Sequence, residues 1–105
     1  MIIRVDIDNT ICTTNDVDYV LAQPIKHMID WINGLYTDGH TIIYWTARGA
    51  VTGLDWKGLT EHQLKEWGCL YHSLEMGKPH YDLMICDKTI NPRGMDDDYR
   101  TIMGV

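Results

Sequence analysis

The sequence contains no phenylalanine, only three prolines, and no apolar run long enough to span a membrane as a helix. Such a helix needs roughly 20 apolar residues, so we expect no membrane association. The first residues, MIIRVDID, lack the long apolar stretch of a secretory signal and have the β-branched character of a strand. With no such signal, three cysteines indicate reduced thiols and a cytoplasmic location.

Positive charge is also scarce. Nine lysines and arginines stand against fifteen aspartates and glutamates, which gives a formal net charge of -6. This balance leaves no basic surface for non-specific binding to nucleic acid or to anionic lipid. A phosphorylated substrate is still compatible with it, because a bound divalent cation can reverse the local field.

The sequence is rich in core-forming residues for its length. Its 105 residues are 45% hydrophobic and include four tryptophans and six tyrosines. This length suits one domain rather than two. We therefore expect a single domain over 1–105, in which residues 91–105, with their three consecutive aspartates, form a loosely held tail.

The apolar pattern alternates between strand and helix periods. Short β-branched or aromatic runs predict strands at 2–6, 41–45, 69–75 and 81–85. A helix is predicted from Pro24 to before Gly39, and a second from an N-cap at Thr60, with Gln63 completing a capping box, to before Gly68. This order favours an α/β fold: a Rossmann-like three-layer sandwich with a mainly parallel sheet of about four strands.

Polar side chains follow the ends of these predicted strands. Asp6 and Asp8 end the first, Thr46 follows the second and Asp87 follows the fourth. Ligands of parallel sheets bind at the carboxyl ends of the strands, so these side chains should meet. Side chains alternate along a strand, so the carboxylates of Asp6 and Asp8 can point to one side.

These residue types fit phosphoryl transfer. Two close carboxylates repel each other unless a cation or a shared proton intervenes, and carboxylate oxygens suit Mg²⁺. An ionised aspartate is a competent nucleophile toward phosphorus, and a second one can serve as acid and base. The Thr46 hydroxyl and the Lys78 ammonium, in Gly77-Lys78-Pro79, would stabilise the charge of the phosphoryl oxygens.

The ordered set resembles the haloacid dehalogenase (HAD) superfamily of phosphatases. The motifs that carry the resemblance are Asp6-Ile7-Asp8-Asn9-Thr10, Thr46 after Ile42-Ile43-Tyr44-Trp45, Lys78, and Asp87 after Leu83-Met84-Ile85. The stretches WTARG, LTEHQLKEWG and GKPHYDLMICDKTIN are more narrowly similar to small proteins called capsular or polysaccharide biosynthesis phosphatases.

The resemblance implies a role for each matching residue. Asp6 would be the nucleophile and a magnesium ligand, Asp8 the acid and base with its backbone carbonyl on the metal, and Asp87 a metal-site acid. Thr46 and Lys78 would bind the phosphate, with Asn9 and Ala47 beside the substrate.

The resemblance also implies a HAD-like core without a cap domain, because the insertion points at 12–23 and 48–58 are too short for one. An open site suits a sugar phosphate, a larger phosphorylated molecule, or shielding by a second subunit of a homo-oligomer.

Two alternatives stay open beside a phosphatase. Cys86 stands where the family usually has an acid, and a thiol is a poor magnesium ligand, so the chain could be a catalytically impaired binding or regulatory module. A receiver-type signalling domain also uses clustered acids, but needs an aspartate after a later strand, where this chain has Glu75-Met76. Arg48 is interpreted as a surface or ion-pair residue, and Cys12 as a packing residue.

Overall fold

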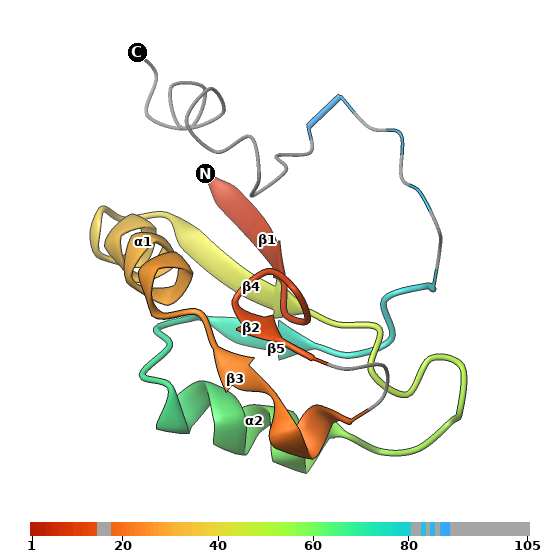
Figure 1. Cartoon of the computed structure of the whole chain (residues 1–105). Helices are drawn as coiled ribbons and strands as arrows, with labels where there is room; N and C mark the ends of the chain where they lie inside the picture. The colour runs from red at the N-terminus through yellow and green to blue at the C-terminus, as the bar shows by residue number, and fades with distance from the viewer. Residues whose placement is uncertain (15–17, 81–82, 84, 86, 89–105) are drawn as a thin grey trace.

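A computed structural model describes residues 1–14, 18–80, 83, 85, 87 and 88 (Figure 1). Along the chain its elements are β1 (Ile2–Asp6), β2 (Cys12–Thr13), the short 3₁₀ helix η1 (Tyr19–Leu21), β3 (Gln23–Pro24), α1 (Lys26–Thr37), β4 (Thr41–Trp45), α2 (Lys57–Glu66) and β5 (Ser73–Glu75).

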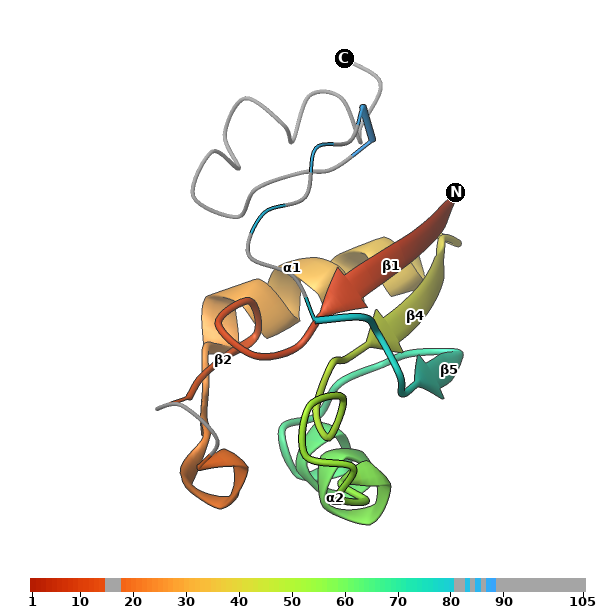
Figure 2. The ribbon, with the colours of Figure 1, turned by 90° about the vertical axis from the view of Figure 1, so that its right-hand side faces the viewer.

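The main sheet is parallel and has the strand order β1-β4-β5. Its register places Val5 beside Tyr44 and Tyr44 beside Leu74. The two crossovers, through α1 and α2, progress in the same direction, and right-handed crossovers then put both helices on one face of the sheet. Figure 2 shows α1 and α2 on the same side of the strands. The predicted parallel α/β fold is confirmed, but the described residues form a three-stranded sheet with one helical layer, rather than three layers and about four strands.

The core lies between this sheet face and the two helices. Ile42 and Tyr44 alternate with more exposed neighbours along β4, and both are fully buried. The helices add Ile29, Ile32 and Leu35 from α1 and Leu64 from α2 to the same cluster. An apolar stripe on α1 covers the sheet, whereas the buried side of α2 contributes one apolar residue beside two polar ones.

Helix α1 begins two residues later than the predicted start at Pro24. Pro24 pairs instead with Cys12 in the short antiparallel ribbon of β2 and β3. The predicted stop is confirmed: α1 ends at Thr37, and Gly39 has a positive φ of 98°. A glycine in this conformation ends helices readily because it has no Cβ to clash.

Helix α2 begins earlier than predicted, at Lys57, and Trp56 occupies its N-cap position. The predicted capping box of Thr60 and Gln63 is wrong. Both residues lie inside the helix, and the Thr60 hydroxyl donates to the Trp56 carbonyl at 2.7 Å. Their polar groups face the interior of the molecule, where Arg48 binds them.

The predicted strand at 81–85 is wrong at the two positions that can be judged. Leu83 and Ile85 lie outside any strand, and their relative exposures are 79% and 94%. The rest of this run, including Cys86 next to it, and the predicted tail at 91–105 lie outside the described residues. Within the described ranges, no helix is both long enough and apolar enough to cross a membrane.

Candidate active site

A cleft of about 830 Å³ opens at the carboxyl ends of the parallel strands. The loops that follow β1 and β4 and the segment after β5 form its walls. Its lining residues are Asp6, Asp8, Asn9, Thr14, Tyr19, Ala47, Gly49, Val51, Thr52, Lys78, Pro79 and His80. The fold thus places a cleft at the edge of the sheet where a parallel topology is expected to bind ligands.

Asp6 is the last residue of β1, and its carboxylate is held at one oxygen. Oδ1 accepts a hydrogen bond from the Ile7 N–H at 3.0 Å and lies 3.4 Å from the Lys78 Nζ. Among the described residues Oδ2 has no polar partner, and Asp6 lines the cleft. Burial raises the pKa of Asp6, while Lys78 and the Ile7 N–H oppose that shift.

The chain after β1 turns sharply and returns toward Asp8. Asn9 adopts a positive φ of 62°, which asparagine tolerates better than most residues, and its N–H donates to the Cys12 carbonyl at 2.7 Å. The turn brings the Thr14 hydroxyl within 2.9 Å of Asp8 Oδ1, to which it donates. The Asp8 carboxylate is therefore bound by a residue of its own loop, in addition to its contact with Arg48.

Arg48 has the predicted ion-pair role, but its predicted surface position is wrong. Its side chain is fully buried, and its Nη2 lies 2.8 Å from Asp8 Oδ1 while its Nε lies 3.0 Å from Oδ2. Its Nη1 donates to Thr60 and Gln63 on α2. Such a two-point contact fixes the orientation of a carboxylate as well as its charge.

The structure, rather than the sequence, supplies the signal for this role. Arg48 lies two residues after Thr46, at the end of a buried strand, and two polar residues, Thr60 and Gln63, occupy the buried side of α2. Buried polar groups require partners, and a buried arginine satisfies both.

The Cys12 thiol also faces Asp8, with Sγ 3.6 Å from Oδ1. Burial and the Asp8 charge raise the pKa of this thiol to about 11. A thiol with such a pKa is a weak nucleophile at neutral pH. The geometry agrees with the interpretation of Cys12 as a packing residue.

Thr46 joins the strand ends to Lys78. It is 1% exposed, its N–H donates to the Glu75 carbonyl at 3.1 Å, and its carbonyl accepts the Lys78 N–H at 3.0 Å. The Lys78 ammonium lies 5.5 Å from the centre of the Trp45 ring, a cation–π arrangement. These contacts bring Lys78 to Asp6, as the sequence predicts.

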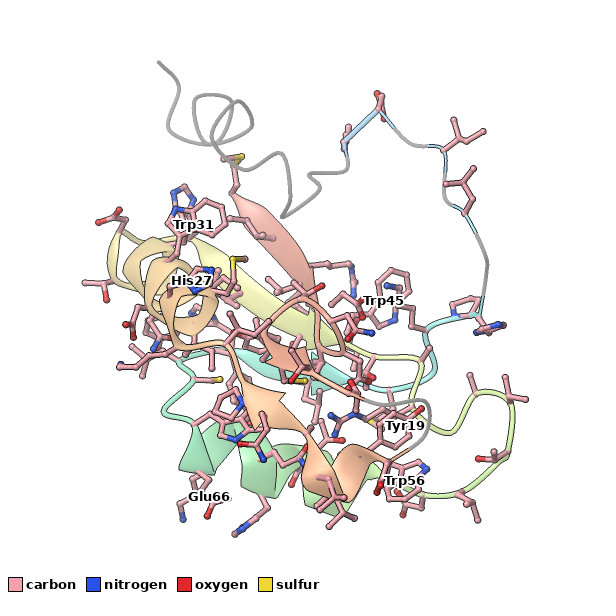
Figure 3. The ribbon with its side chains drawn as sticks, viewed as in Figure 1. Tyr19, His27, Trp31, Trp45, Trp56 and Glu66 are labelled. Atoms are coloured by element: carbon pink, nitrogen blue, oxygen red, sulfur yellow. The ribbon has the colours of Figure 1, made fainter. Side chains whose placement is uncertain are left out.

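Tyr19 lines the cleft and packs against a second aromatic ring. Figure 3 shows Tyr19 and Trp56 side by side, and their rings meet edge to face with centroids 5.1 Å apart. The Arg48 guanidinium lies 4.7 Å from the centre of the Tyr19 ring. Tyr19 was not among the predicted site residues, because its segment has no helical or strand periodicity.

The structure does not bring Asp87 to the other acids. Figures 1 and 2 both draw the segment 87–88 away from the carboxyl ends of the strands. Within the described part of the chain, no group of three histidines, cysteines or acids could hold a metal ion. We expected a strand at 81–85 to carry Asp87 to the carboxyl ends of the other strands. The two described residues of this segment, Leu83 and Ile85, are not in the sheet.

Comparisons with known proteins give one structural match. Neither the family models nor the curated protein sequences match this chain. A crystal structure of a protein from Vibrio cholerae superposes with a TM-score of 0.82 at 20% sequence identity, over 97% of this chain and 96% of that one. At this identity the likeness shows the fold.

Proposed function

We propose that the protein is a magnesium-dependent phosphatase of the HAD type, which hydrolyses phosphomonoesters through an aspartyl-phosphate on Asp6. One observation carries the proposal: the Asp6 carboxylate lines a cleft, with Lys78 at its Oδ1 and with Oδ2 unengaged by any described residue. The cleft is wide, which suits a sugar phosphate or a larger phosphorylated molecule.

In the first step, Asp6 Oδ2 attacks the phosphorus and the bond to the leaving oxygen breaks. Asp8 gives its proton to that oxygen, so that the alcohol leaves neutral. The Lys78 ammonium stands beside the nucleophile to neutralise charge on the phosphoryl oxygens. The Thr46 hydroxyl accepts a hydrogen bond from the backbone N–H of Arg48 at 3.1 Å. The proton of the hydroxyl is therefore left to donate to a phosphoryl oxygen.

In the second step, a water attacks the phosphorus of the aspartyl-phosphate. Asp8, now ionised, takes a proton from that water, and the bond between the phosphorus and Asp6 Oδ2 breaks. Inorganic phosphate leaves, and both aspartates return to their starting states. Asp8 thus serves each half of the reaction from one position.

The magnesium ion belongs to the same proposal. It would neutralise phosphate charge, and the Asp6 carboxylate and the Asp8 backbone carbonyl would hold it; Asp87, which the resemblance implies as a further ligand, lies away from both (Figures 1 and 2). The donor set fits in part: Asp6 offers an unengaged oxygen, and Mg²⁺ is commonly held by one or two carboxylates together with water and phosphate. Mg²⁺ alone should raise the unfolding temperature of the wild type but not of Asp6→Asn.

The test is hydrolysis of p-nitrophenyl phosphate by the full chain with Mg²⁺. We expect turnover that a chelator stops and that Asp6→Asn lowers by at least about a thousandfold. Asp30→Asn is the matched control, because Asp30 is an exposed acid on α1 paired with Lys26. Turnover by Asp6→Asn at the wild-type rate would refute the nucleophilic role.

A non-catalytic binding module is the second candidate. The absence of a three-acid group among the described residues favours it, as does Cys86 beside Asp87. Cys86→Asp separates the two candidates. Activity that appears only in this variant supports the binding module, whereas activity in the wild type supports the phosphatase.

A further inference from the structure

We infer that Arg48 is a positioning residue, which fixes the Asp8 carboxylate so that Oδ2 is the oxygen that exchanges a proton with the leaving group. This inference rests on the proposed phosphatase function. It assigns a role to a buried residue that is not among those lining the cleft.

The contacts of Asp8 are unequal at its two oxygens. Oδ1 lies 2.8 Å from Arg48 Nη2 and 2.9 Å from the Thr14 hydroxyl, and the Cys12 thiol faces it at 3.6 Å. Oδ2 accepts from Arg48 Nε alone, at 3.0 Å. A carboxylate oxygen has room for about two hydrogen bonds, so Oδ2 keeps a position for a transferred proton.

Arg48 can impose this orientation because it is itself held from behind. Its Nη1 lies 2.6 Å from Gln63 Oε1 and 3.1 Å from Thr60 Oγ1. Gln63 is fixed in turn, because its Nε2 donates to the Tyr19 carbonyl at 2.6 Å. The planar guanidinium is therefore clamped between α2 and the loop that carries Asp8.

A lysine at position 48 would keep the positive charge but lose the planar set of N–H donors that a guanidinium provides. One ammonium cannot occupy the positions of Nε, Nη1 and Nη2 at once, so it cannot bind Asp8 at two points while it also binds Gln63. Arg48→Lys should therefore loosen the orientation of Asp8 without removing its counter-charge.

The test measures kcat/KM over a series of aryl phosphates whose leaving groups differ in pKa. A poor leaving group needs the proton from Asp8, whereas a very good one leaves without it. We expect Arg48→Lys to lose at least about tenfold more kcat/KM on phenyl phosphate than on dinitrophenyl phosphate. Equal losses across the series would mean a merely structural role and would overturn the inference.

Two further variants keep the outcome decisive. Arg4→Lys makes the same substitution at a half-exposed ion pair with Glu75, and should leave the leaving-group dependence unchanged. If Arg48→Lys does not fold, Gln63→Leu removes the anchor behind Arg48 and should change that dependence in the same direction by less. An unchanged dependence in Gln63→Leu then overturns the inference.

The failure of this inference can be told apart from failure of the proposed function. A wild-type chain that hydrolyses no member of the series with Mg²⁺ refutes the phosphatase, and with it an acid role of Asp8. A wild type that is active, with Arg48→Lys weakened equally on all substrates, refutes only the positioning role.

Discussion

Asp6 and Asp8 lie two residues apart, yet their carboxylates are held by different cations to different degrees. Lys78 Nζ approaches Asp6 Oδ1 at 3.4 Å, and the Asp6 side chain is 42% exposed. Arg48 binds Asp8 at two points, with a fully buried side chain. The first carboxylate is left open toward the cleft and the second is locked, an asymmetry that supports the proposed roles of nucleophile and proton carrier.

Because the two carboxylates are held differently, Asp8→Asn and Asp6→Asn should change the stability of the fold in opposite directions. Asp8→Asn should lower the free energy of unfolding by about 1–3 kcal/mol, because the amide keeps one acceptor oxygen and leaves an N–H of the buried Arg48 guanidinium without an acceptor. Urea unfolding of the two proteins measures this. Asp30→Asn, at an exposed pair, should change stability by less than about 0.5 kcal/mol. An Asp8→Asn variant as stable as the wild type would show that the pair is not a structural tie.

Asp6→Asn should instead stabilise the fold at neutral pH. Burial raises the pKa of Asp6 above its ordinary 3.8, so the folded state prefers the protonated form. The stabilisation from protonating Asp6 is full below 3.8 and is lost as pH rises through the pKa of the folded state. The amide has no such loss.

The prediction for Asp6→Asn can be measured as a difference between two proteins. The urea midpoints of variant and wild type, in a buffer with chelator, should match near about pH 4 and separate toward about pH 7, the variant being higher. If the wild type is the more stable of the two proteins at neutral pH, the raised pKa of Asp6 is contradicted.

The cysteines of the core should be inert in the folded protein. The pKa values of Cys12 and Cys69 are raised to about 11, chiefly by burial. In a Cys86→Ser background, iodoacetamide should label neither thiol at mildly alkaline pH, and both after unfolding in urea. Rapid labelling of Cys12 in the native protein would show that the Asp8 loop opens readily.

Gly49 and Gly53 offer a matched pair in the loop that lines the cleft. Both have a positive φ, 83° and 74°, so alanine is strained at either. A Cβ at Gly49 would also collide with the Leu54 carbonyl oxygen and press on Trp56, whereas one at Gly53 meets nothing. Gly53→Ala should cost about 1 kcal/mol, and Gly49→Ala clearly more, as measured by thermal unfolding. Equal losses would mean that the loop yields easily.

The sequence predicts much of the fold because local patterns decide it. The β-branched runs at β1 and β4 and the apolar stripe of α1 each bury one face, and period alone assigns them. Asp6 and Thr46 could be placed together because one ends and the other follows a strand of a parallel sheet, and Lys78 joined them through the resemblance.

The rest depends on contacts between distant residues. Thr60 and Gln63 match a capping box as a local pattern, but their actual partner, Arg48, is 12 and 15 residues away. The location of Asp87 was inferred from one apolar run, whose members Leu83 and Ile85 are exposed. An apolar run alone does not say whether a strand finds a neighbour to pair with.

The central claim is that Asp6 becomes covalently phosphorylated during turnover. The most direct test is to quench the wild-type protein with acid during hydrolysis of an aryl phosphate with Mg²⁺ and to map the modified peptide by mass spectrometry. We predict one phosphoryl group on Asp6, lost on treatment with hydroxylamine and absent from Asp6→Asn. A protein that turns over substrate with Asp6 unmodified, or with the phosphoryl group on another residue, would contradict the account.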